Sequence, residues 1–103
     1  MNKIQMLNDS FRKDFTGGRV MFTPGIIDLG DIDVVASKVR EFNDFEPGND
    51  PYGEHDFGAF DYEGTKIFWK IDYYDNKLEL GSPDPADSSK TTRVLTIMTA
   101  SEY

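Results

Sequence analysis

Residues 55–74, HDFGAFDYEGTKIFWKIDYY, decide the fold of this chain. Apolar and polar side chains alternate over residues 65–74, which is the period of a β-strand with one buried face. Residues 55–62 alternate more loosely, and Glu63-Gly64 between the two segments favours a two-residue turn. The sequence therefore predicts a β-hairpin whose second strand is the better defined of the two.

The register of this hairpin follows from its turn. It places Gly58 opposite Trp69, so that the large indole lies over a residue without a side chain. It also places Asp61 opposite Lys66, which is a favourable pair of opposite charges. The face that this register turns toward the core carries Ile67, Trp69 and Ile71.

A second two-residue turn is predicted at Asp75-Asn76, because both residues tolerate a positive φ. A third strand would then return beside the second one. In this register Leu78 and Leu80 lie on the same face as Trp69, opposite Tyr73 and Ile71. The agreement of these faces favours the register.

The two turns together bring His55, Asp72 and Glu79 side by side on three adjacent strands. A histidine with two carboxylates can bind a divalent metal or act in acid–base chemistry. The like charges of the two carboxylates would then be offset by the metal or by a protonated histidine. A slip of one residue at either turn scatters the three side chains, and they are then ordinary surface residues.

Four further segments complete the predicted architecture. Apolar residues at helical spacing predict helices over residues 4–15 and 32–42, and residues 19–23 predict a short strand that Pro24-Gly25 ends. Residues 92–99 are rich in β-branched and apolar side chains and predict a largely buried strand. We expect one α+β domain, residues 1–103, with two helices packed on one face of a mainly antiparallel four- to five-stranded sheet, the face that carries Trp69.

The composition excludes several classes of protein. The chain has no cysteine, which removes disulfides, thiolate catalysis and cysteine-ligated zinc. No apolar run is long enough to span a membrane and no signal peptide opens the chain, so we expect a soluble, cytoplasmic protein without membrane contact. The formal net charge is −8, which disfavours direct binding to nucleic acid and favours a basic protein surface as partner.

The negative charge is concentrated in one part of the chain. Residues 41–87 hold thirteen acids and three lysines, and between Arg40 and Lys66 there are eight acids and no lysine or arginine. Such a segment is either a solvated face that keeps the protein soluble or a docking surface for a basic groove. The candidate partner-binding residues are Asp44, Glu46, Asp50, Tyr52, Glu54, Asp56, Asp61 and Glu63, with Tyr52 as an aromatic anchor.

Motifs of catalysis are absent from the sequence. His55 is the only histidine, so it cannot belong to a two-histidine metal motif. There is also no Gly-x-Ser-x-Gly nucleophile elbow and no glycine-rich phosphate loop. We therefore expect no cofactor and no catalytic residue, and we expect His55 to orient its loop by hydrogen bonds.

Three aromatic residues, Phe57, Phe68 and Tyr74, fall on the second face of the predicted sheet. If no helix covers that face, they form an exposed apolar patch of the kind that is typical of protein interfaces. The alternative is that the long loops fold over them.

Four strings of residues, 52–60 (YGEHDFGAF), 67–75 (IFWKIDYYD), 81–87 (GSPDPAD) and 92–98 (TRVLTIM), carry a family resemblance. The chain resembles a DUF3768-like bacterial family of unknown function that is found largely on plasmids and other mobile elements. The family brings no established activity and no known catalytic residues. The resemblance implies genes for plasmid upkeep and for countering host defence as genomic neighbours.

The leading hypothesis is a small non-enzymatic protein that uses its acidic segment to occupy a basic groove on a host nucleic-acid-binding protein. Its carboxylates would imitate a phosphate backbone, as in an anti-CRISPR or antirestriction inhibitor. One alternative is a small metal-dependent enzyme centred on His55, Asp72 and Glu79. Another is a regulatory or self-associating module of a plasmid system.

Overall fold

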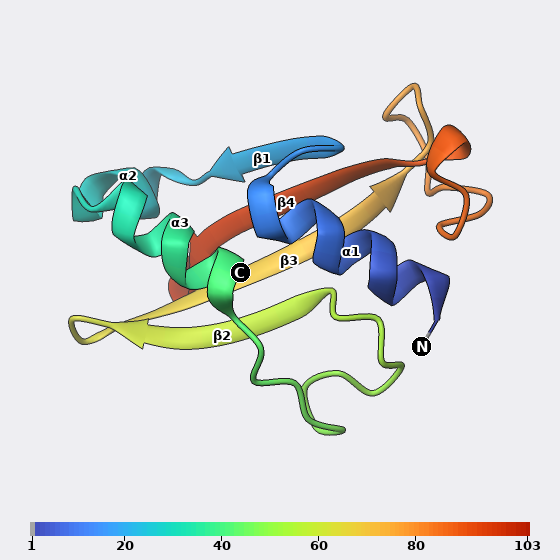
Figure 1. Ribbon diagram of the computed structural model, residues 1–103. Helices are drawn as coiled ribbons and strands as arrows, with labels where there is room; N and C mark the ends of the chain where they lie inside the picture. The colour runs from blue at the N-terminus through green and yellow to red at the C-terminus, as the bar shows by residue number, and fades with distance from the viewer. Residues whose placement is uncertain (1) are drawn as a thin grey trace.

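The computed structural model describes residues 2–103 and has an α+β fold (Figure 1). The three α-helices and one strand come first in the chain, and the other three strands follow them. A short 3-10 helix, η1, precedes the last strand, and another, η2, follows it. In chain order the elements are α1 (Lys3–Asp14), β1 (Gly18–Phe22), α2 (Pro24–Leu29), α3 (Ile32–Glu41), β2 (Phe57–Tyr62), β3 (Thr65–Tyr74), η1 (Ser88–Lys90), β4 (Thr92–Thr99) and η2 (Ala100–Glu102).

The four strands form one mixed sheet in the order β1-β4-β3-β2. β4 lies antiparallel to β3 and parallel to β1, and β2 lies antiparallel to β3 at the other edge. The sheet is therefore mainly antiparallel, as predicted, but one of its pairs is parallel. β4 is central because its apolar side chains are buried on both faces of the sheet.

The register predicted for the first hairpin is confirmed. Gly58 pairs with Trp69 and Asp61 pairs with Lys66. Glu63 and Gly64 both have positive φ, 48° and 82°, which is the backbone of a two-residue hairpin turn. The predicted pairing of His55 with Asp72 is wrong, because His55 has a φ of 56° and leaves the strand before its first paired residue.

The second predicted hairpin is wrong. The carboxylate of Asp75 accepts hydrogen bonds from the backbone N–H of Lys77 and of Glu79, at 3.2 and 3.0 Å, and this closes a longer turn over residues 75–80. Leu78 has a φ of 58°, and Leu80 is 71% exposed. The neighbour of β3 on this side is β4, which forms eight residue pairs with it.

Both predicted helices are present as α1 and α3, and both cover the face of the sheet that carries Trp69 (Figure 1). The third helix, α2, is an addition to the prediction. It begins at Pro24, which is favoured at the first position of a helix, and it ends at Gly30 with φ 81°. The core between the helices and the sheet consists of Phe11, Ile26, Val35, Val39, Ile67, Trp69, Ile71, Leu95 and Ile97.

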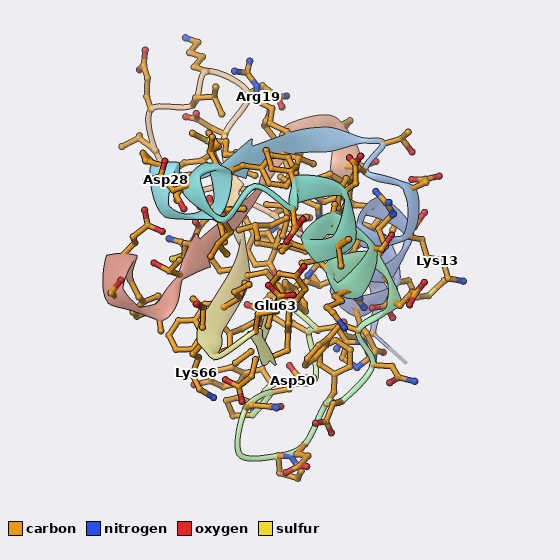
Figure 2. All side chains as sticks on the ribbon, turned by 90° about the vertical axis from the view of Figure 1, so that its left-hand side faces the viewer. Lys13, Arg19, Asp28, Asp50, Glu63 and Lys66 are labelled. Carbon is orange, nitrogen blue, oxygen red and sulfur yellow. The ribbon has the colours of Figure 1, made fainter. Side chains whose placement is uncertain are left out.

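Within residues 2–103, none of the three α-helices covers the second face of the sheet (Figure 2). Phe57 and Phe68 lie there, and the ring of Tyr103 packs edge-on against them at centroid distances of 6.2 and 5.5 Å. This part of the face is therefore partly buried by the residue that follows η2 rather than by a long loop. Within residues 2–103, none of the helices has the length and apolar character that a membrane span requires.

Candidate interaction surface

The loop over residues 42–56 leaves the end of α3 and passes below β2, the edge strand that it then enters (Figure 1). It has no regular secondary structure, because its two prolines, two glycines and two asparagines interrupt backbone pairing. Nonetheless its path is fixed by side chains from the helical layer, and three groups of contacts do this.

The first contact is made by Arg12 of α1, which is only 5% exposed. Its Nη1 donates to the carbonyl oxygens of Val39 and Phe42, at 2.8 and 2.7 Å, which lie at the end of α3. The guanidinium also lies over the ring of Trp69 at 4.8 Å. Burial lowers the pKa of Arg12, and the nearby carboxylate of Asp9 opposes this effect. Arg12 thus joins α1, α3 and the beginning of the loop.

The second contact is made by His55, at the end of the loop. Its ring stacks on Phe45 with a centroid distance of 3.8 Å, and its Nδ1 lies 2.9 Å from a carboxylate oxygen of Asp9. Gln5 of α1 lies 2.7 Å from Nε2, and Asp50 accepts a hydrogen bond from the His55 backbone N–H at 3.1 Å. The prediction that His55 orients its loop by hydrogen bonds is confirmed.

The third contact is a buried polar network around Asn8, which is fully buried in α1. Its Nδ2 donates to the Glu54 carbonyl oxygen at 3.0 Å and to the Tyr73 hydroxyl at 2.7 Å. Arg93 donates from Nε to Asn8 Oδ1 at 2.7 Å, and the Tyr73 hydroxyl donates to the Glu54 carboxylate at 2.9 Å. Burial raises the pKa of Tyr73, so the hydroxyl stays protonated as the network requires.

Sequence reasoning missed Asn8, Arg12 and Arg93. The signal was present, because Asn8 and Arg12 lie beside the apolar residues Leu7 and Phe11 on one helix, and Arg93 is the only charged residue of a largely buried strand. A polar side chain that shares an apolar stripe must find partners when it is buried. The partners here come from residues 39, 42, 54 and 73, which no local pattern connects to α1.

The loop, β2 and the turn after β2 carry the eight predicted partner-binding residues, and the exposure of these residues differs. Asp44, Glu46, Asp61 and Glu63 are exposed, and Tyr52 is 82% exposed. Asp50 is buried and directs its carboxylate at His55, so it serves the loop rather than the surface. We call the remaining seven the acidic edge: Asp44, Glu46, Tyr52, Glu54, Asp56, Asp61 and Glu63.

Crowding of like charges is visible at Asp56, where the loop joins β2. Burial raises the pKa of Asp56, and the nearby carboxylates of Glu54, Asp50 and Asp72 raise it further. At the far end of β2, Asp61 lies 3.7 Å from Lys66, whereas Glu63 forms no ion pair within residues 2–103. The negative potential of the acidic edge is therefore only partly neutralised by the protein itself.

The alternative metal site is not formed. His55 lies on the helical side with Asp9 and Asp50, whereas Asp72 lies on the opposite face and pairs with Lys70 at 2.9 Å. Glu79 lies in the turn of residues 75–80. In the part of the chain that the structure describes, no group of three or more histidine or carboxylate side chains is arranged to hold a metal ion. The predicted adjacency fails because His55 leaves the chain path of the first hairpin before its first paired residue, and because the second hairpin does not form.

Asp50 gives a direct test of how the loop is held. We expect Asp50→Ala to speed backbone hydrogen exchange over residues 43–56 and to lower the free energy of unfolding by about 1–2 kcal/mol, because the partly buried His55 N–H loses its acceptor. Asp84→Ala is the matched control, since Asp84 accepts from the N–H of Ala86 in a different loop. Unchanged exchange over residues 43–56 in Asp50→Ala would contradict this account.

Comparison with known proteins places the chain in a family. No curated protein and no solved structure matches it. A family model described as "Protein of unknown function (DUF3768)" matches residues 22–102, a stretch that contains most of the sheet, the loop and the acidic edge. The chain therefore belongs to the DUF3768 family of proteins of unknown function.

Proposed function

We propose that the protein is a small, non-enzymatic interaction protein that binds the basic groove of a nucleic-acid-handling protein through its acidic edge. In this proposal it acts as an inhibitor carried by a mobile element, of the anti-CRISPR or antirestriction type, and it works in the cytoplasm. The carboxylates take the place of phosphates, so the inhibitor and the nucleic acid compete for the same groove.

The observation that carries the proposal is the pairing of exposed carboxylates with a fixed backbone. Asp44, Glu46 and Glu63 are exposed, while Arg12 and His55 hold the loop that bears the first two. A surface that is already ordered loses little conformational entropy when a partner binds. An acidic segment that served only solubility would have no need of such an anchor.

The dimensions of the acidic edge also favour the proposal. Its charges lie at both ends of β2, a strand of six residues. At a rise of about 3.3 Å per residue the ends of β2 are about 20 Å apart, which is the length of about six base pairs of DNA at 3.4 Å each. Tyr52, 82% exposed in the same loop, can insert between or beside basic side chains as an aromatic anchor.

The test is a capture experiment with nuclease-treated host lysate and the purified full chain. We expect a nucleic-acid-binding protein to be retained at about 0.1 M salt, to be released at about 1 M salt, and to be displaced by added DNA or RNA. The loss-of-charge variant is Asp44→Asn, Glu46→Gln and Glu63→Gln together, which spares Asp61 because Lys66 already pairs with it. This variant is expected to retain much less of the target.

The control variant removes the same three charges elsewhere. Asp28, Asp33 and Asp84 are exposed and lie outside the acidic edge, so we expect their joint replacement by asparagine to leave capture nearly unchanged. Equal retention by the two variants would refute the proposal, and so would retention of proteins that nucleic acid does not displace.

A further inference from the structure

The uncovered face of the sheet is hollowed into a groove of about 550 Å³. Its floor comes from β1, β4 and β3, and its ends are formed by the turn of residues 75–80 and by the residues around η2 (Figure 2). The apolar side chains that line it are Met21, Tyr74, Leu78, Val94, Met98 and Tyr103. This groove is separate from the acidic edge.

Several of the apolar side chains around the groove are open to solvent. Met21 is 57% exposed, Tyr103 is 74% exposed, and Leu80, in the turn beside Leu78, is 71% exposed. Large apolar side chains that gather on one face mark an interface more often than they mark an ordinary surface. The other face of the same sheet is covered by α1 and α3.

The lining of the groove is electrically neutral, whereas the chain as a whole is strongly negative. The lining contains two cations, Arg19 and Lys70, and two anions, Asp72 and Glu102, in a chain of net charge −8. Lys70 and Asp72 pair at 2.9 Å. Hydrogen bonds from Thr23, Thr99 and Gly25 lower the pKa of Glu102 to about 2 and hold its carboxylate in place.

Two opposite charges at one end of the groove remain without an ion pair within residues 2–103. Arg19 lies on β1 at the rim (Figure 2), and Glu79 lies between the exposed Leu78 and Leu80. A face that bears an apolar groove, a free cation, and an exposed turn with two leucines and a free anion is complementary to itself. Two-fold pairing of identical patches is the usual way in which such a face is covered.

We infer that the uncovered sheet face is the interface of a homodimer. The sheets of two copies pack face to face, the turn of residues 75–80 of each copy lies against the groove of the other, and Glu79 of each copy approaches Arg19 of the other. Because the lining of the groove is neutral and the turn of residues 75–80 adds a net charge of only −1, this face is where two chains of charge −8 meet with little repulsion. The inference does not depend on the proposed function.

The size of the face indicates the class of interface that it can form. Four strands at about 4.8 Å spacing and eight residues at about 3.3 Å give a face of about 19 by 26 Å. Two such faces bury on the order of 1,000 Å² in total, which is near the lower limit for a specific interface. We therefore expect a weak, reversible dimer, tightened by salt because salt screens the net repulsion.

The experiment is sedimentation equilibrium of the full chain from about 10 μM to about 1 mM, at low and at high salt. We expect concentration-dependent dimerisation, and we expect Met21→Asp and Leu80→Asp each to raise the dissociation constant tenfold or more. Met6→Asp is the matched control, because the side chain of Met6 is 54% exposed, a fraction similar to that of Met21. Met6 lies on α1, in the helical layer and outside the proposed interface. The control variant introduces the same charge and is expected to change the constant less than twofold.

Two variants at different positions keep the test decisive if one of them folds poorly, and circular dichroism establishes which of them are folded. Charge reversal tests the proposed contact between Arg19 and Glu79 of the two copies. Arg19→Glu and Glu79→Arg should each weaken the dimer, and the double variant should restore it. A wild-type chain that stays monomeric at about 1 mM and high salt would overturn the inference. Dissociation by Met6→Asp but not by Met21→Asp and Leu80→Asp would overturn it as well. Neither result would bear on the acidic edge, whose target binding weakens with salt.

Discussion

Replacement of Arg12 by alanine is expected to lower the free energy of unfolding by about 3–5 kcal/mol. A domain of this size is stabilised by only about 5–15 kcal/mol in total, so most of the margin would be lost. Thermal or urea denaturation followed by circular dichroism measures the change.

The physical reason lies in the groups that Arg12 satisfies. It donates to the carbonyl oxygens of Val39 and Phe42 at the end of α3, where a helix leaves its last carbonyls without partners. Alanine leaves these buried acceptors unsatisfied and also empties the space over Trp69. We expect Arg12→Met, which restores much of the volume but no donor, to recover only a part of the loss.

Arg40→Ala is the control for this prediction. Arg40 lies on α3 and also stacks on an aromatic ring, that of Phe15 at 4.8 Å, but it is more exposed and its hydrogen bond to Ser37 is long, 3.4 Å. We expect a loss of about 1 kcal/mol or less. If the two alanine variants were equally stable, the account of Arg12 as the anchor of the loop would be wrong.

Replacement of Gly58 by valine is expected to cost about 3 kcal/mol, at the upper end of the range for an overpacked core. A Cβ atom on Gly58 would lie 2.6 Å from Cε2 of Trp69 and 2.8 Å from Cε1 of Phe42. Trp69 is fully buried and cannot move aside without disturbing the core. The same denaturation experiment measures the loss.

Gly48→Val is the matched control, because Gly48 lies in the exposed part of the loop and a Cβ there meets nothing within 4 Å. We expect its effect to stay within about 0.5 kcal/mol. A double-mutant cycle with Trp69→Phe adds a second check, since the smaller ring should make valine at position 58 less costly. Additive losses would mean that the indole is not what excludes a side chain.

The first hairpin shows what a single sequence can predict. Its turn, its register and the contact between Trp69 and Gly58 all depend on residues within about a dozen positions of one another, and the alternation of side chains fixes the buried face. The two long helices follow from apolar spacing for the same reason. The exposure of Asp44, Glu46, Asp61 and Glu63 also follows from their place in a loop or at a turn.

The errors have tertiary causes. His55 leaves the strand because Phe45, Asp9 and Asp50 hold it from other parts of the chain, and Asp50 is buried for the same reason. The turn after β3 is longer than predicted because the Asp75 side chain takes the hydrogen bonds that a tight turn would have left to the backbone. The place of β4 between β1 and β3 could not be predicted, because an apolar strand suits any central position.

The central position of β4 has a consequence for the synthesis of the chain. Within residues 2–103, β1 pairs with β4 alone, with Gly18 beside Arg93, and β3 is paired only with β2 until β4 has been synthesised. While the ribosome is still adding residues 75–91, only the local hairpin of β2 and β3 can form, and open strand edges are exposed to other nascent chains. Most of the acidic residues of 41–87 have already been translated at this stage, and their mutual repulsion keeps such edges apart. The negative charge that is proposed to bind a basic partner thus also disfavours aggregation of the incompletely synthesised sheet.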